Sequence, residues 1–248
     1  MTNSAAVAID RERLPVPSRA LTIGAHPDDA EFGAGGTLAK WARAGCQVSM
    51  VVVTDGSKGS WDPAISPADL VEIRAAEQVA AAGALGVTGD VVHLDYVDGE
   101  LEYTMGLRKQ ICECIRRLRP DVVLSHDPWR RYMLHPDHRA TGMGTIDGVV
   151  AARDHLFYPE LGLDKHRPAA ILLWGADQPD YWEDIAATFD VKIMSLLCHT
   201  SQTQSTMNGA TDDDEARAAF VTRMEEWAAN NGEPVGLPRA ESFKLIRP

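Results

Sequence analysis

The feature that most constrains this fold is an alternation of short apolar runs with helix-like segments. Residues 47–54 (QVSMVVVT) are typical of the apolar runs, because they are rich in β-branched side chains and short enough for a buried strand. The other predicted strands cover residues 20–25, 91–94, 121–125, 170–174 and 185–189. The predicted helices cover residues 37–44, 67–84, 107–118, 136–153 and 215–229.

This alternation predicts an α/β chain built from βαβ units. Because parallel strands need long crossover connections, helices come to lie on both faces of such a sheet. We therefore predict a Rossmann-like three-layer fold with a mainly parallel sheet flanked by helices. The chain has 248 residues, enough for one such domain. We expect an N-terminal arm over residues 1–19 and a single α/β domain over residues 20–248 that ends in a helical and loop extension.

Charge and hydropathy exclude several kinds of partner. The formal net charge is -12, which disfavours binding to nucleic acid and to anionic membranes. Charged side chains at residues 10–13 stand where a signal peptide would need an apolar stretch, and no run is apolar enough to insert into a membrane. We expect a soluble cytoplasmic protein whose partner is a small molecule or a glycoconjugate.

Two groups of histidine and aspartate follow predicted strands. The first lies in residues 25–31 (AHPDDAE) and the second in residues 135–138 (HPDH). Functional residues of parallel sheets gather at the carboxyl ends of strands, and two histidines with one carboxylate leave a fourth metal position open for water. We predict a catalytic zinc site held by His26, Asp29 and His138, with another divalent ion such as Fe²⁺ as an alternative.

The neighbouring polar residues are assigned to the reaction. Asp28 and Asp29 are adjacent, so their side chains cannot easily reach one atom from the same side, and we assign Asp28 as the general base. His135 would stay off the metal and, as a cation, stabilise the oxyanion or protonate the departing amine. Asp137 would orient an imidazole from behind.

Residues 26–48, followed by VVVTDG at 51–56, are similar to the opening of the PIG-L/LmbE-like deacetylase family. The HPDH motif resembles the second motif of the family. Weaker similarities lie at residues 74–77 (RAAE), 98–101 (DGEL) and 199–202 (HTSQ), so that the resemblance spans about residues 21–202.

Members of this family are zinc-dependent and include N-acetylglucosaminyl-phosphatidylinositol deacetylases and the deacetylases of mycothiol and bacillithiol synthesis. The resemblance implies that His26, Asp29 and His138 bind the zinc and that Asp28 is the base. Because members of the family often form oligomers, it also implies a homo-oligomer. It also implies that Arg74 contacts substrate hydroxyls or phosphate, and it makes Asp98 and His199 candidates for substrate binding. Some members use a tyrosine two residues before the first histidine of HPDH. Here Met133 stands there, and Tyr132 is the candidate to replace it.

We predict a zinc-dependent hydrolase that removes an N-acyl group, expected to be N-acetyl, from an amino sugar or glycoconjugate. One alternative is an amidase that acts on a thiol-sugar conjugate. Two histidines and a carboxylate also suit a non-haem iron oxygenase, and a non-catalytic metal-binding module is a third alternative.

Three further features remain open at the sequence level. His126 and Asp127 follow the fourth predicted strand, without an assigned role. His199 either lines the pocket or packs in the core. Residues 33–36 (GAGG) lack the final spacing of a dinucleotide-binding loop, so we predict that they pack a helix closely against a strand.

Overall fold

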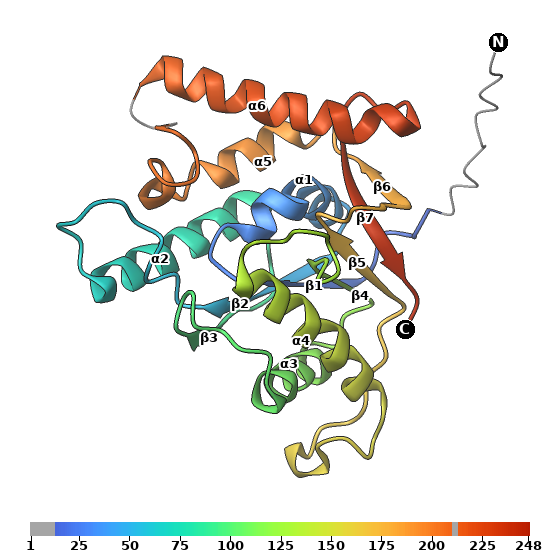
Figure 1. Ribbon diagram of the computed structural model, residues 1–248. Helices are drawn as coiled ribbons and strands as arrows, with labels where there is room; N and C mark the ends of the chain where they lie inside the picture. The colour runs from blue at the N-terminus through green and yellow to red at the C-terminus, as the bar shows by residue number, and fades with distance from the viewer. Residues whose placement is uncertain (1–12, 210–212) are drawn as a thin grey trace.

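The computed structural model describes residues 13–209 and 213–248, so residues 1–12 of the predicted N-terminal arm lie outside the described residues. Strands and helices alternate along the chain (Figure 1). The strands are β1 Arg19–Gly24, β2 Gln47–Thr54, β3 Val91–Tyr96, β4 Val122–His126, β5 Ala170–Trp174, β6 Tyr181–Asp184 and β7 Ala240–Ile246. The α-helices are α1 Asp29–Arg43, α2 Pro67–Leu85, α3 Met105–Leu118, α4 Pro136–Arg153, α5 Phe189–Leu196 and α6 Asp214–Gly232. Short 3₁₀ helices cover η1 Pro159–Leu161, η2 Thr200–Gln202 and η3 Glu233–Val235.

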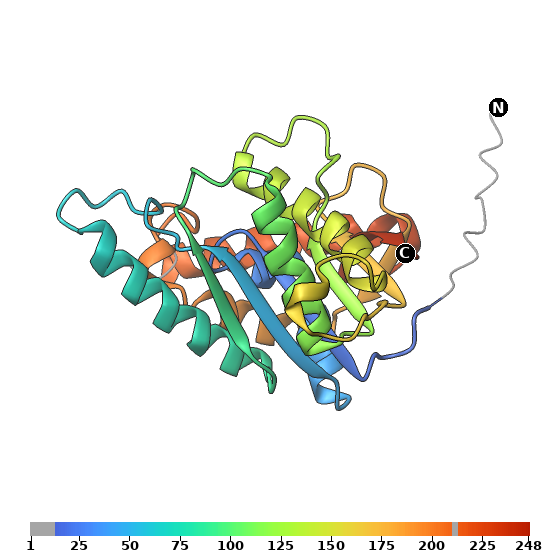
Figure 2. The same ribbon diagram turned by 90° about the horizontal axis from the view of Figure 1, so that it is seen from below.

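The strands form one seven-stranded sheet in the order β3-β2-β1-β4-β5-β7-β6. The pairs from β3 to β5 are parallel, and β7 pairs antiparallel with both β5 and β6. Helices cover both faces, with α3 and α4 on one side and α1, α2, α5 and α6 on the other (Figures 1 and 2). The predicted fold class is therefore confirmed.

Alternation along the central strands supplies two cores. In β1, Ala20 belongs to the cluster that includes Leu38 and Trp41 of α1, whereas Leu21 packs in the opposite cluster with Ile111 of α3. Successive side chains of a strand point to opposite faces, so a strand buried on both sides has an almost continuous apolar sequence.

The second half of the chain differs from the sequence prediction. Residues 185–189 are not a strand. They form a turn, in which the Thr188 N–H donates to the Ile185 carbonyl, and then the start of α5. The strand lies just before them as β6, and β7 was not predicted. Helix α1 begins at Asp29 rather than at residue 37.

The glycines of α1 explain its weak helical signal and confirm the predicted close packing. A Cβ atom on Gly33 would lie 2.5 Å from the Trp174 ring, and one on Gly36 would lie 2.7 Å from Ile185. Glycine is a poor helix former, but at these positions only hydrogen fits.

The topology brings the two predicted motifs to one place. From β1 the chain builds the sheet outward through β2 and β3, whereas from β4 it builds toward β5 on the other side. The strand order reverses between β1 and β4, and crevices at such switch points bind ligands in open α/β sheets. Within the described residues, no helix is both long and apolar enough to cross a membrane.

Candidate metal and catalytic site

His26 follows β1 and is held on both sides of its ring. Nδ1 lies 3.2 Å from Nε2 of His138 and 3.4 Å from Oδ2 of Asp29. Nε2 lies 3.1 Å from Oδ2 of Asp137 and 3.2 Å from Oδ1 of Asp98. A carboxylate behind a ligand imidazole fixes its tautomer, because the imidazole donates its other N–H to that carboxylate. With its Nε2 proton held by these carboxylates, the ring would offer the Nδ1 lone pair to a metal ion.

Asp29 and His138 complete a compact set of donors. Asp29 is the first residue of α1, and its Oδ1 lies 3.3 Å from Nε2 of His138. His138 lies in the first turn of α4, which begins with Pro136, as predicted. Donors placed tetrahedrally at zinc-ligand distances would be roughly 3.3 Å apart. The two imidazole nitrogens lie 3.2 Å apart, and each has one oxygen of the Asp29 carboxylate within 3.4 Å, so the three residues suit a common small cation.

The charges around this set also favour a cation. Burial opposes protonation of His26, but hydrogen bonds with Asp137, Asp29 and Asp98 outweigh it and raise the pKa of His26 to about 12. Burial would raise the pKa of Asp29, but His138 and His126 hold it well below its usual value. Three carboxylates thus favour a positive charge at His26, and a divalent ion bound at Nδ1 would take the place of the second ring proton.

Two further histidines lie beside the set. In the described chain, His26 with His135 and His138, and Asp29 with His126 and His138, form groups whose ligand atoms lie within 4.8 Å of one another. The ring of His138 stacks between the other two, at 4.2 Å from the His126 centroid and 4.7 Å from that of His135.

His126, the last residue of β4, holds Asp29 in place. The indole N–H of Trp174 donates to Nδ1 of His126 at 3.1 Å, and Nε2 lies 3.1 Å from Oδ2 of Asp29. The Ala25 N–H also lies 3.3 Å from Nε2. The ionised carboxylate can only accept, however, so we place the proton on Nε2. Burial lowers the pKa of His126 to about 4, consistent with a neutral ring.

Asp28 stands beside the metal set in a strained conformation. Its φ is 105°, in the left-handed region, and its side chain makes no capping bond at the start of α1. The carboxylate therefore stays free of the helix, although it is only 6% exposed. Burial raises the pKa of Asp28 to about 6, against the opposing effect of Arg74.

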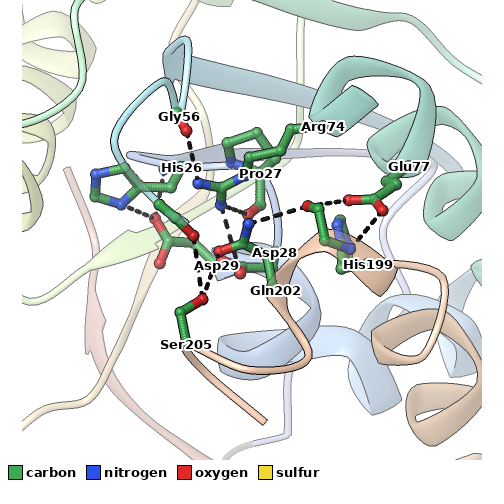
Figure 3. Close-up of polar contacts among 12 residues, drawn as sticks. His26, Pro27, Asp28, Asp29, Gly56, Arg74, Glu77, His199, Gln202 and Ser205 are labelled. Atoms are coloured by element: carbon green, nitrogen blue, oxygen red, sulfur yellow. Dashed lines mark hydrogen bonds and ion pairs between the residues drawn. The ribbon is translucent and has the colours of Figure 1, made fainter. Parts of the chain in front are cut away.

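Arg74 supports Asp28 from α2 (Figure 3). It donates to the carbonyls of Gly56 at 3.0 Å and Pro27 at 2.6 Å, and its Nη2 lies 3.6 Å from Oδ2 of Asp28. Arg74 lines the main cavity, so the predicted contact with substrate hydroxyls stays open to it.

Glu77, one helical turn from Arg74, connects α2 to η2. Its carboxylate accepts hydrogen bonds from the Thr200 hydroxyl at 2.7 Å and from both the backbone and the side chain of Ser201. This clamp holds the HTSQ segment, of which Gln202 lines the main cavity.

His135 is the residue before α4. Burial and the neighbouring His26 and His138 lower its pKa, and its Nδ1 has no hydrogen-bond partner among the described residues. The lowered pKa disfavours the cation, and the cationic role of His135 stays a prediction. Asp137 hydrogen-bonds to His26 and accepts the backbone N–H of Gly99.

A cavity of about 550 Å³ opens onto these groups. Its lining includes the predicted residues His26, Asp28, Asp29, Arg74, Asp98, His135 and His138. Sequence reasoning missed Lys58, Trp61, Ser205 and Thr206, which also line it. These residues lie in loops outside every motif, so only the folded chain brings them here.

Two predicted contact residues lie away from this cavity. Tyr132 is 87% exposed, with φ 61°, and lines neither cavity described here. His199 is fully buried, with Nε2 3.8 Å from Oε2 of Glu31.

Asp127 accepts the Trp129 N–H at 2.9 Å in a local turn.

The PIG-L family, described as GlcNAc-PI de-N-acetylase, matches residues 21–149. The chain is 38% identical over 187 residues to a diacetylchitobiose deacetylase of Thermococcus kodakarensis, covering 74% of this chain and 70% of that one. It is 27% identical to a probable N-acetyl-alpha-D-glucosaminyl L-malate deacetylase of Bacillus anthracis, covering 84% and 90%. The structure of N,N'-diacetylchitobiose deacetylase from Pyrococcus horikoshii, complexed with its inhibitor, matches with a TM-score of 0.84 and 31% identity, covering 93% of this chain and 84% of that one.

Proposed function

This chain belongs to the PIG-L family and is a deacetylase of the N-acetylglucosamine type, and we propose that it hydrolyses the N-acetyl group of a small amino sugar at a zinc site formed by His26, Asp29 and His138. The observation that carries this proposal is that His26 Nδ1 and His138 Nε2 lie 3.2 Å apart, with one carboxylate oxygen of Asp29 at 3.4 Å from the first and the other at 3.3 Å from the second. Family membership excludes the iron oxygenase and the non-catalytic binding module.

The hydrogen bonds of the other histidines support this choice of ligands. His126 carries its proton on the nitrogen that faces Asp29, so it has no lone pair to offer there. His135 lies beside the ligand set as a hydrogen-bond donor. Two imidazole nitrogens and one carboxylate oxygen suit zinc and also Fe²⁺, so the native metal is decided by measurement.

A zinc ion held by these residues would lower the pKa of a water molecule and polarise the amide carbonyl. Asp28 would accept the proton from that water, and its raised pKa of about 6 suits a base that works near neutral pH. Arg74, 3.6 Å away, favours the ionised form that this role requires. His135 would donate a hydrogen bond to the developing oxyanion or, when it is protonated, a proton to the departing amine.

The larger cavity supports an amino sugar as the substrate. Lys58, Arg74 and Asp98 supply charged hydrogen-bonding groups for hydroxyls, and Trp61 supplies an aromatic face. A mono- or disaccharide of N-acetylglucosamine fits this lining and agrees with the diacetylchitobiose deacetylases it resembles. A sugar–malate conjugate of a thiol-cofactor pathway is the second candidate, on the resemblance to the Bacillus anthracis protein.

The test is release of primary amine from N-acetylglucosamine, N,N'-diacetylchitobiose and N-acetylglucosaminyl malate, with zinc-loaded and chelator-treated protein. We expect turnover of at least one sugar that disappears with chelator and returns with zinc. Asp28→Asn should keep zinc but lower kcat by at least ~100-fold, whereas Asp69→Asn on the exposed start of α2 should change neither. Full zinc content in both His26→Ala and His138→Ala would refute the ligand assignment.

A further inference from the structure

A second cavity, of about 220 Å³, lies beside the same metal set. It shares Asp29, Phe32 and His138 with the larger cavity. Asp28 and His135, the proposed base and proton donor, line only the larger one. The two cavities therefore meet at the proposed ligands, with the proton-transfer groups on one side.

The second cavity has a different chemical character from the first. Apart from Asp29, His126, His138 and Arg130, its side-chain wall is apolar, and it is made by Phe32, Met133, Trp174, Met224 and Trp227. Met133 and Met224 are partly buried, and thioether chains adapt to ligands of different length. Hydrocarbon fits this wall better than a hydroxylated sugar ring.

An amide substrate has two substituents, and each needs its own space at the metal site. The carbonyl carbon of an amide carries an amine substituent and an acyl substituent, which leave the carbonyl on different sides. The amine must lie near the proton donor His135, and the sugar hydroxyls suit Lys58 and Asp98, all in the larger cavity. The acyl substituent is left to point into the smaller one.

We propose that the cavity lined by Met133, Trp174, Met224 and Trp227 is the acyl-binding subsite and that it admits acyl chains longer than acetyl. This inference rests on the proposed function. A methyl group is about the size of a water molecule, whose share of liquid volume is about 30 Å³. The cavity of about 220 Å³ has room for several further methylene groups.

The test compares kcat/KM for N-acetyl-, N-propionyl-, N-butyryl- and N-hexanoylglucosamine. Burial of each methylene group stabilises the bound state by an amount worth up to about fourfold. We expect N-butyrylglucosamine to be hydrolysed at least as efficiently as N-acetylglucosamine. Met224→Trp, which fills the cavity from α6, should lower kcat/KM for the butyryl and hexanoyl substrates at least ~10-fold more than for the acetyl substrate.

Matched variants separate this effect from a loss of folding. Met133→Phe fills the same cavity from a loop, so it should show the same selectivity if Met224→Trp fails to fold. Met194→Trp makes the same exchange on α5 at a residue that is 52% exposed and lines neither cavity, and it should leave the acyl preference unchanged.

The outcomes distinguish this inference from the proposed function. Turnover of the acetyl substrate alone would refute the subsite and leave the deacetylase intact. Selective loss of N,N'-diacetylchitobiose turnover in Met224→Trp would assign the cavity to a second sugar ring and also overturn the inference. If no substrate releases amine, the proposed function fails. Binding of free carboxylates, which correspond to the acyl groups, then decides the inference. Quenching of tryptophan fluorescence must show tighter binding of hexanoate than of acetate, and Met224→Trp must abolish the difference.

Discussion

At the scale of single residues, the site depends on which nitrogen of each imidazole carries the proton. His26 directs its Nε2 proton to Asp137 and Asp98, which leaves Nδ1 free to bind a cation. His126 receives the Trp174 N–H on Nδ1, which commits its own proton to Asp29. Two residues of the same type therefore have different roles because their neighbours differ.

The first prediction tests the contact between Trp174 and His126. Trp174→Phe keeps an aromatic ring but removes the N–H that Nδ1 of His126 accepts. We expect zinc affinity to fall ~10–100-fold, the usual effect of losing a residue that orients a ligand. Competition with a chromophoric chelator measures it. Trp41→Phe, on the core-facing side of α1, is the control, and equal affinity in the two variants would contradict the role of Trp174.

The sequence predicts the residues of the two motifs but not their supporting partners. His26, Asp29 and His138 could be found because each follows the carboxyl end of a strand with a recognisable motif. Trp174 lies 48 residues from His126, and no local pattern connects them. His199 was assigned from its motif to the substrate, yet it lies fully buried beside Glu31.

At the scale of elements, the packing of α1 against β5 controls how close the metal set lies to the sheet. A Cβ atom on Gly33 would lie 2.5 Å from the Trp174 ring, and the same ring donates a hydrogen bond to His126. A change in the distance between α1 and β5 would therefore displace Trp174, and with it His126 and Asp29.

The second prediction compares two glycine-to-alanine exchanges. Gly33→Ala places a methyl group 2.5 Å from the Trp174 ring and should lower the free energy of unfolding by about 1–3 kcal/mol. Gly83→Ala in α2 meets nothing within 4 Å and should raise it by up to about 1 kcal/mol. Urea denaturation of both metal-free variants measures the difference, and equal stabilities would show that the contact with Trp174 relaxes without cost.

The C-terminal elements show why part of the fold was not predicted. Residues 240–246 (AESFKLI) mix charged and apolar side chains, which is typical of an exposed segment. In the structure this segment is β7, and Glu241 is fully buried. Its partner, Lys192, lies 49 residues earlier, so the sequence pattern cannot show that the charge is neutralised.

At the scale of the whole molecule, one buried ion pair connects the last strand to the helix that carries the site. The Lys192 ammonium lies 2.6 Å from Glu241 of β7 and donates to the Phe32 carbonyl of α1 at 2.7 Å. Glu241 also accepts from the backbone of Gly36 and Thr37. Burial lowers the pKa of Lys192, and Glu241 opposes that shift.

The third prediction concerns this pair. Lys192→Met leaves the carboxylate of Glu241 buried without its cation and should cost about 3–5 kcal/mol of unfolding free energy. Lys192→Met combined with Glu241→Gln should cost less, because no uncompensated charge remains. Lys109→Met, which breaks an exposed pair with Glu160, should cost under about 1 kcal/mol. Urea titrations of the three variants test this order. A double variant with a lower free energy of unfolding than Lys192→Met would contradict it.

The left-handed backbone of Asp28 has a consequence for the history of such a chain. Glycine would adopt this conformation freely, whereas an aspartate held there costs about 1–3 kcal/mol. In a lineage that no longer needed the reaction, a single codon change from aspartate to glycine at residue 28 could therefore raise the free energy of unfolding. Persistence of the acidic side chain at residue 28 in a descendant would be a mark of selection for chemistry over stability.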